Sequence, residues 1–292
     1  MPSLKAIRTR IRSVKSTQQI TRAMKMVSAA KLRRAQESIV SARPYVQRME
    51  DVLKDLAKRV DLSAHPLLVR RPVKRVEIVV LTSDRGLCGG FNGSIVRRVQ
   101  RYRWENEEKL EKLSLRTIGR KGNEAFRRRG VEIRKDHAGL FKTLTYAAAE
   151  SLAAELTDEF LTGEFDAVYL AYNEFVSAVT QKVSLVELLP IRSPEDAQAN
   201  AGPATFPVDY EYEPSRERVL QDLLPRYVAS EVWRALLESV ASEHGARMSA
   251  MDSATKNANE MIGRLTLQYN RTRQAGITKE LMEIVSGAEA LK

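Results

Sequence analysis

Apolar residues near the start of the chain recur at the spacing of one helix face. The first of them, at steps of three, four and three residues, are Leu4, Ile7, Ile11 and Val14. This spacing predicts an α-helix, and Ser3 stands where a helix N-cap is favoured. We expect one helix to about residue 59, interrupted or bent near Pro44. A helix roughly 80 Å long must pack against another long helix or another protein.

The middle of the chain alternates between strand-like and helix-like stretches. It lies between two proline-containing connectors, at 61–72 and 190–214. The predicted strands are 75–82, 114–119, 131–133, 167–172 and 181–189, and the predicted helices are 94–112, 121–129 and 144–161. Because short β-branched runs alternate with helices, we predict a mostly parallel sheet with helices on its faces.

The helical period returns from Ser215, and Pro225 lies inside it, so we expect a kink or a fresh helix start there. The two terminal helices have nothing of comparable length to pack on except each other. The predicted fold is α/β: a long antiparallel coiled coil of N- and C-terminal helices with an inserted Rossmann-like α/β domain. The predicted domains are coiled-coil helices at 1–60 and 215–292 and an α/β domain at 73–190. The C-terminal helix should extend past the N-terminal one at the far tip.

The positive charge lies in the N-terminal segment. Residues 1–60 hold 15 Lys and Arg against 4 Asp and Glu, a balance of +11 that equals the formal charge of the whole chain. Besides a coiled-coil face, such a segment fits an organelle transit peptide, a helix on an anionic membrane or an arm that binds nucleic acid. The lack of a cleavage-like break counts against the first, and the lack of aromatic residues before Tyr45 counts against the others.

The cysteine and histidine content limits the chemistry that the chain can perform. Cys88 is the single cysteine, which excludes an internal disulfide and fits a reducing compartment. The three histidines, at 65, 137 and 244, are widely spread, so a metal site is not expected. No run of 18 apolar residues occurs, and we therefore expect no membrane-spanning helix.

A glycine-rich turn, SDRGLCGGFNGS at 83–94, follows the first predicted strand and precedes a helix. That context suits a phosphate-binding loop, but the turn has neither the GK[ST] of a P-loop nor the G-x-G-x-x-G spacing. Asp84 and Arg85 have no nucleophile–base pair nearby in sequence. A tight, exposed turn used for docking is the favoured interpretation, with Cys88 either reactive or simply a small buried residue.

Several long motifs together resemble one family. They are IRSVKSTQQITRAMKMVSAAKLRRAQ near the start, TSDRGLCGGFN, YEYEP at 210–214, and RMSAMDSATKNANEMIGRLTLQYNRTRQAGITKELMEIVSGAEAL at the end. The chain resembles the gamma subunit of F-type ATP synthases, and the order of helix, α/β insert and helix agrees. Pattern and composition alone stop at a long basic coiled coil with an α/β insert.

The resemblance implies a central rotor shaft inside a ring of three alpha and three beta subunits, with its foot on the c-ring beside the epsilon subunit. It implies no cofactor, no nucleic acid and no bond chemistry in this chain. The expected location is peripheral, on the cytoplasmic face of the bacterial inner or plasma membrane. The alternative that remains is a basic coiled-coil protein that binds nucleic acid or acts as a scaffold.

The resemblance also implies two sets of partner contacts. The first set contacts the beta subunit and the sleeve, by which we mean the surrounding ring of alpha and beta subunits. Its residues are Met24, Lys25, Arg247, Arg273, Gln274, Thr278, Glu280 and Glu283. The contacts to the lower region, near epsilon and the c-ring, are Asp84, Arg85, Gly86, Leu87, Cys88, Gly89, Gly90, Tyr210 and Glu211.

Overall fold

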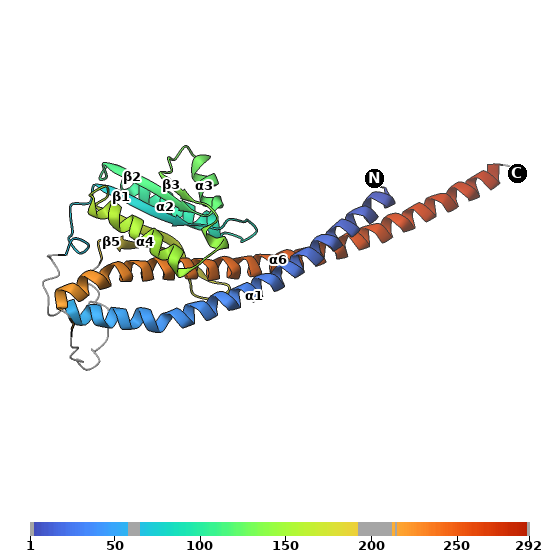
Figure 1. The fold of residues 1–292 in the computed structure, drawn as a ribbon. Helices are drawn as coiled ribbons and strands as arrows, with labels where there is room; N and C mark the ends of the chain where they lie inside the picture. Colours follow the sequence, from blue (N-terminus) through green and yellow to red (C-terminus); the bar gives the residue numbers. More distant parts are fainter. Residues whose placement is uncertain (1–2, 58–64, 192–211, 214, 291–292) are drawn as a thin grey trace. The chain divides into compact units, whose positions relative to one another are not determined.

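The computed structural model describes residues 3–57, 65–191, 212–213 and 215–290 (Figure 1). Two compact units divide the chain: residues 30–246 form one, and the two ends, up to residue 29 and from residue 247, form the other. This division does not coincide with the predicted domains at 1–60, 73–190 and 215–292, which stay a prediction.

Two long helices begin and end the described chain. They are α1 (Leu4–Ala57) and α6 (Arg216–Ala290). At the start of α1 the Ser3 hydroxyl accepts a hydrogen bond from the Ala6 amide at 3.2 Å, so the predicted N-cap is confirmed. The expected interruption at Pro44 and the fresh start at Pro225 are both wrong, because each proline lies inside an unbroken helix.

The physical reason is packing on either side of the prolines. A proline inside a helix costs about 3 kcal/mol. Within the 30–246 unit, Leu53 and Leu56 of α1 and Leu224 and Val228 of α6 are buried in one hydrophobic cluster. Burying side chains of this size contributes about 1.5–3 kcal/mol each, so the cluster offsets the cost of a missing backbone hydrogen bond.

A five-stranded sheet forms the centre of the 30–246 unit, in the order β3-β2-β1-β4-β5. Its strands are β1 (Arg75–Leu81), β2 (Lys112–Ile118), β3 (Lys135–His137), β4 (Ala167–Phe175) and β5 (Gln181–Leu189). The first four run parallel, and β5 pairs antiparallel with β4 at the edge. The predicted mostly parallel, Rossmann-like insert is therefore confirmed.

Helices cover both faces of this sheet (Figure 1). They are α2 (Phe91–Glu105), α3 (Arg120–Arg127) and α4 (Tyr146–Leu161), with a short 3₁₀ turn, η2 (Leu140–Lys142). Val76, Ile78 and Val80 pack with α2 and α3, whereas Val79 and Leu81 pack with α4 and with the long helices. Alternate residues of one strand thus serve two cores, which is why β1 is apolar almost throughout.

Two sequence expectations about this unit are corrected. The third strand is not at 131–133: the Val131 amide donates to the Phe126 carbonyl at 3.1 Å, which closes the turn after α3, and pairing starts only at Lys135. The helix expected to reach residue 112 ends at Glu105, because the Glu111 and Lys112 amides both donate to the Lys74 carbonyl beside the sheet.

The other unit contains only helix, from the first part of α1 and the last part of α6. Thr21 contacts Thr255, and Lys25, further along α1, contacts Asp252, which lies earlier in α6. Since residue numbers rise on one helix as they fall on the other, the two run antiparallel, as predicted.

Candidate partner-contact surfaces

Lys25 and Met24 lie on the side of α1 that meets α6, and both are partly buried. The Lys25 ammonium donates to Asp252 Oδ1 at 2.6 Å, and Lys256 lies 3.0 Å from the other oxygen of the same carboxylate. Hydrogen bonds from Lys25 and Lys256 lower the pKa of Asp252. Lys25 is therefore held by a carboxylate of its own chain, while its side chain remains 45% exposed and open to a further acidic partner.

The expected C-terminal contacts do not form one cluster. Arg247 is only 8% exposed, whereas Arg273 lies 26 residues further along the same helix, about 39 Å away. The remaining members of this set are exposed: Gln274, Thr278, Glu280 and Glu283. The Thr278 hydroxyl donates to the Gln274 carbonyl at 3.0 Å, and Glu283 pairs with Lys279 of the same helix at 3.6 Å.

Apolar side chains face outward along this end of the molecule. On α1, Ile20, Met26 and Val27 are 57%, 62% and 57% exposed. On α6, the exposed apolar residues are Met261, Leu267, Ile277, Leu281, Met282, Ile284 and Val285. At the same time Thr21 and Ser28 are buried between the helices, at 8% and 3% exposure. An apolar surface this exposed indicates that another protein covers the outside.

The glycine-rich turn closes tightly at the carboxyl end of β1. The Ser83 hydroxyl donates to the Arg85 carbonyl at 2.6 Å, and the Asn92 side-chain amide donates to Cys88 Sγ at 3.3 Å. Asp84 accepts from the Arg120 amide at 3.2 Å. Cys88 is 2% exposed, so its structural role as a small buried residue is the one that the geometry supports.

The tip of that turn is exposed. Leu87 and Gly89 both have positive φ, 63° and 57°, a conformation that a leucine seldom adopts. The Leu87 side chain is 63% exposed, and Gly89 and Gly90 beside it are exposed as well. An apolar side chain held outward on a constrained backbone is suited to docking. Tyr210 and Glu211 lie outside the described residues.

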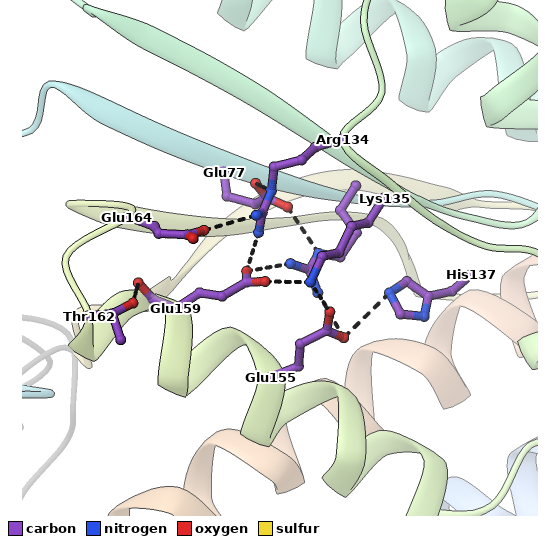
Figure 2. Close-up of polar contacts among 9 residues, drawn as sticks. Glu77, Arg134, Lys135, His137, Glu155, Glu159, Thr162 and Glu164 are labelled. Atoms are coloured by element: carbon purple, nitrogen blue, oxygen red, sulfur yellow. Dashed lines mark hydrogen bonds and ion pairs between the residues drawn. The ribbon is translucent and has the colours of Figure 1, made fainter.

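A network of charges that the sequence analysis missed lies between β1–β3 and α4 (Figure 2). Arg116, 0% exposed, donates to Glu77 at 2.9 Å and contacts Glu155 at 3.1 Å. Both Arg116 and Arg134 also bond to Glu159. This network replaces apolar packing on one part of the sheet face and joins three strands to one helix.

The balance of burial and charge differs among the carboxylates of the network. Burial raises the pKa of Glu77, although the hydrogen bond and charge of Arg116 and the charge of Arg134 oppose it. Burial also acts to raise the pKa of Glu155, but the hydrogen bond from Lys135 and the charge of Arg116 outweigh it, so this pKa is lowered. The sequence did contain a signal: Glu77 and Arg116 are charges of opposite sign in the interior of the strands RVEIVVL and KLSLRTI.

Neither a membrane span nor a metal site is found among the described residues. None of the helices in these ranges combines the length and hydropathy that a span requires. No group of three or more His, Cys, Asp or Glu side chains in the same ranges is placed to hold a metal ion.

Comparison with known proteins identifies the family. The family model described as ATP synthase matches residues 3–291. An ATP synthase gamma chain of Anaeromyxobacter sp. (strain Fw109-5) is 62% identical over 295 residues, which cover 100% of both chains. The chain belongs to the ATP synthase gamma-chain family. The gamma chain of Geobacter sp. (strain M21) is 52% identical over 292 residues, again 100% of both chains.

Solved structures agree with this membership of the gamma-chain family. A chain from the central stalk and c-ring structure of Tetrahymena thermophila mitochondrial ATP synthase has 29% identity and a TM-score of 0.60, over 80% of this chain and 99% of that one. A chain from Euglena gracilis mitochondrial ATP synthase has a TM-score of 0.69 over 99% of this chain and 94% of that one. At 22% identity, the latter supports the fold alone.

Proposed function

We propose that this chain is the central rotor shaft of an F-type ATP synthase, which couples ion-driven rotation of the c-ring to ATP synthesis or hydrolysis at the beta subunits. The observation that carries the proposal is 62% identity with an ATP synthase gamma chain over the whole length of both. The likeness to a chain of the Tetrahymena central stalk and c-ring structure supports it. Both favour the shaft over a nucleic-acid-binding or scaffold protein.

The unit formed by the two chain ends, here called the terminal unit, has a surface that suits a shaft enclosed by partner subunits. Exposed apolar residues such as Leu267, at 73%, and Ile284, at 72%, lose contact with water when alpha and beta subunits surround them. The basic balance of residues 1–60 attracts acidic loops in every rotational position of the shaft. A surface that is apolar and cationic lets a shaft turn without one strongly preferred angle.

We assign the first set of contact residues to the beta subunit and the sleeve. Met24 and Lys25 would meet an acidic segment of the beta subunit, and Lys25 retains an exposed fraction for this. Arg273, Gln274, Thr278, Glu280 and Glu283 would face the upper sleeve, where their exposure leaves them available. Arg247, largely buried at 8% exposure, would act at a separate level of the shaft.

The second set is proposed for the lower contacts, near epsilon and the c-ring. The exposed part of the turn, with Arg85, Leu87, Gly89 and Gly90, is available to such a partner. Asp84 and Cys88 support the turn from within through their hydrogen bonds. Tyr210 and Glu211 complete the set on the strength of the YEYEP motif.

In this role the chain carries no bond chemistry of its own, and nucleotides react at the beta subunits. It is peripheral: it reaches the membrane only through the complex, on the cytoplasmic face of a bacterial membrane. The bacterial gamma chains that it resembles support this placement.

Assembly with alpha and beta subunits tests the proposal. The full-length chain, mixed with both, should elute in size exclusion as one copy with three of each, and the complex should hydrolyse ATP cooperatively. A chain lacking residues 270–292 should assemble less well and give weaker ATPase activity, with circular dichroism confirming that it folds. Failure to form a defined complex, together with salt-sensitive binding to duplex DNA, would favour the nucleic-acid alternative.

A further inference from the structure

The seam of α1 changes from apolar to polar within the unit formed by the two chain ends. Positions that are buried or half-buried against α6 recur at steps of three and four residues, which is the spacing of a coiled-coil seam. In order they are Leu4, Ile7, Ile11, Val14, Gln18, Thr21, Lys25 and Ser28. Four apolar seam residues are thus followed by four polar ones.

Three of the polar residues are matched by polar residues of α6. The Gln18 side-chain amide donates to Asn259, and the hydroxyl oxygens of Thr21 and Thr255 lie 2.8 Å apart. The Lys25 ammonium donates to Asp252 at 2.6 Å. We call these three contacts, Gln18–Asn259, Thr21–Thr255 and Lys25–Asp252, the polar ladder. From Gln18 to Lys25 the ladder residues advance along α1, while their partners run back along α6 from Asn259 to Asp252 in steps of similar size. All three contacts therefore belong to one antiparallel register.

Both hydroxyls of the middle contact also lie within hydrogen-bond distance of a carbonyl of their own helix. Thr255 Oγ1 lies 2.7 Å from the Met251 carbonyl oxygen, and Thr21 Oγ1 lies 3.0 Å from the Gln18 carbonyl oxygen. Either hydroxyl can donate to the other across the seam. A methyl group in place of either hydroxyl would leave the other without this partner in a site where Thr21 is 8% exposed.

The apolar residues beside the ladder are divided between surface and interior. Ile20, Met26 and Val27 of α1 point outward and are more than half exposed, whereas Met251 and Ala258 of α6 are buried, at 5% and 7% exposure. Apolar contacts are non-directional, and a seam of them tolerates displacement by one heptad. Polar groups at seam positions accept only the alignment that pairs them, and specifying register is their best-attested use.

We propose that the polar ladder is a register lock, and that its six residues position the C-terminal end of α6 relative to the start of α1. Extended to Leu4, where α1 begins, the same register reaches the neighbourhood of Arg273. The residues of α6 beyond that point project past α1. A role for this projecting end rests on the proposed function, which assigns residues within it to contacts with the surrounding subunits. Those residues are Gln274, Thr278, Glu280 and Glu283. Displacement by one heptad would move them by about 10 Å.

Disulfide trapping in the full-length chain tests the lock. In a Cys88→Ser background, Ile11→Cys with Leu265→Cys reports the native register, and Ile11→Cys with Thr272→Cys reports displacement by one heptad. With the ladder intact, only the native pair should cross-link, by at least about tenfold. In a chain carrying Gln18→Leu, Thr21→Val, Lys25→Leu, Asp252→Leu, Thr255→Val and Asn259→Leu, the two pairs should cross-link to within about threefold of each other.

If the all-apolar chain still forms only the native cross-link, apolar packing sets the register and the proposal is overturned. Because that chain carries six changes, the pair Thr21→Val and Thr255→Val provides a milder, isosteric version that should also raise the displaced cross-link. An unchanged ratio in this folded variant contradicts the part assigned to the two hydroxyls.

A charge exchange supplies the matched control. Asp252→Lys alone places a third ammonium beside Lys25 and Lys256 and should increase the displaced cross-link. Lys25→Asp combined with Asp252→Lys restores an opposite pair and should return the native ratio. If the exchange behaves like the single change, the ion pair has no role in the register. These readouts need no partner subunits, so they succeed or fail independently of whether the chain assembles into an ATPase.

Discussion

The two compact units of the chain differ in how much of their apolar surface they bury with their own residues. In the 30–246 unit, apolar residues such as Ile78, Phe160 and Leu236 are fully buried. In the unit formed by the two ends, Thr21 and Ser28 are buried between the helices while Leu267 stays 73% exposed. The first unit completes a hydrophobic core from its own residues. The second forms specific contacts inside and leaves its apolar surface for another protein to cover.

This difference assigns separate tasks to separate residues. Stability of the 30–246 unit depends on its core and on the charge network around Arg116. In the terminal unit, the outer residues contribute to assembly more than to folding, because burial of their apolar area awaits a partner. Substitutions in the two units should therefore affect different measurements.

The largest expected effect comes from Arg116→Met. This change leaves Glu77, 0% exposed, without its nearest cation, and breaking a buried pair from one side costs about 3–5 kcal/mol. Urea unfolding followed by circular dichroism measures the loss. Arg33→Met is the control, since its pair with Glu37 is exposed at 84% and 63% and should contribute almost nothing. Equal effects of the two changes would contradict the importance assigned to the network.

Truncating one leucine in each unit should separate folding from assembly. Leu236→Ala, at a fully buried position, should destabilise the chain by about 2–5 kcal/mol. Leu267→Ala should change stability by less than about 0.5 kcal/mol but weaken association with alpha and beta subunits. Thermal melts and size-exclusion titrations measure the two effects. A Leu267→Ala chain that assembles normally would argue against an enclosed tip.

Charge reversal at Arg22 and at Lys25, which belongs to the ladder, should affect coupling more than folding. Arg22→Glu with Lys25→Glu places like charges against an acidic partner, so we expect ATP-driven ion pumping to fall by about fivefold or more. The measured quantity is the number of ions pumped per ATP hydrolysed in reconstituted membranes, compared between the variant and the parent chain. Lys25→Arg retains the charge and should retain most of the coupling. Normal coupling in the charge-reversed variant would show that attraction between the basic helix and an acidic partner has no part in the proposed mechanism.

The smallest effect is the acid dependence of the Asp252 contact. Lys25 and Lys256 lower the pKa of Asp252 in the folded chain, whereas the unfolded value is about 3.9. The contribution is therefore complete above the unfolded pKa and disappears as the pH falls through the folded pKa. Melting temperatures of the parent chain and of Asp252→Asn should differ slightly at pH 7 and converge as the pH falls below 4. A difference that grows in acid would reverse this sign.

Periodicity in the sequence was sufficient to predict the main helices and strands. Steps of three and four from Leu4 to Val14 predicted α1, and the 181–189 run matched β5 residue for residue. The interruption at Pro44 and the fresh start at Pro225 were wrong, because the expectation weighed the lost hydrogen bond without the tertiary packing that offsets it. The bend and the kink given as their alternatives stay predictions. The strand expected at 131–133 failed because Gly130, with φ of 68°, prolongs the turn.

Contacts between distant residues were harder to predict. The sequence analysis did not single out Glu77 and Arg116, and their pairing depends on two strands being neighbours in the sheet. The polar ladder depends on alignment of α1 with α6, which no local pattern specifies. The roles of Met24, Arg273 and the other contact residues came from resemblance, and they stay predictions.

Gly245 gives the molecule a direct path for mechanical load. An added Cβ there would lie 3.2 Å from the Ala178 carbonyl oxygen, so the backbone of the β4–β5 turn rests against the backbone of α6. One turn earlier, the Ser242 hydroxyl donates to the Asn173 carbonyl at 2.9 Å. Force along the helix therefore passes to the sheet through a close backbone contact and a short side-chain hydrogen bond. Such contacts yield less than long flexible side chains, so the sheet and this part of α6 should twist as a single stiff part.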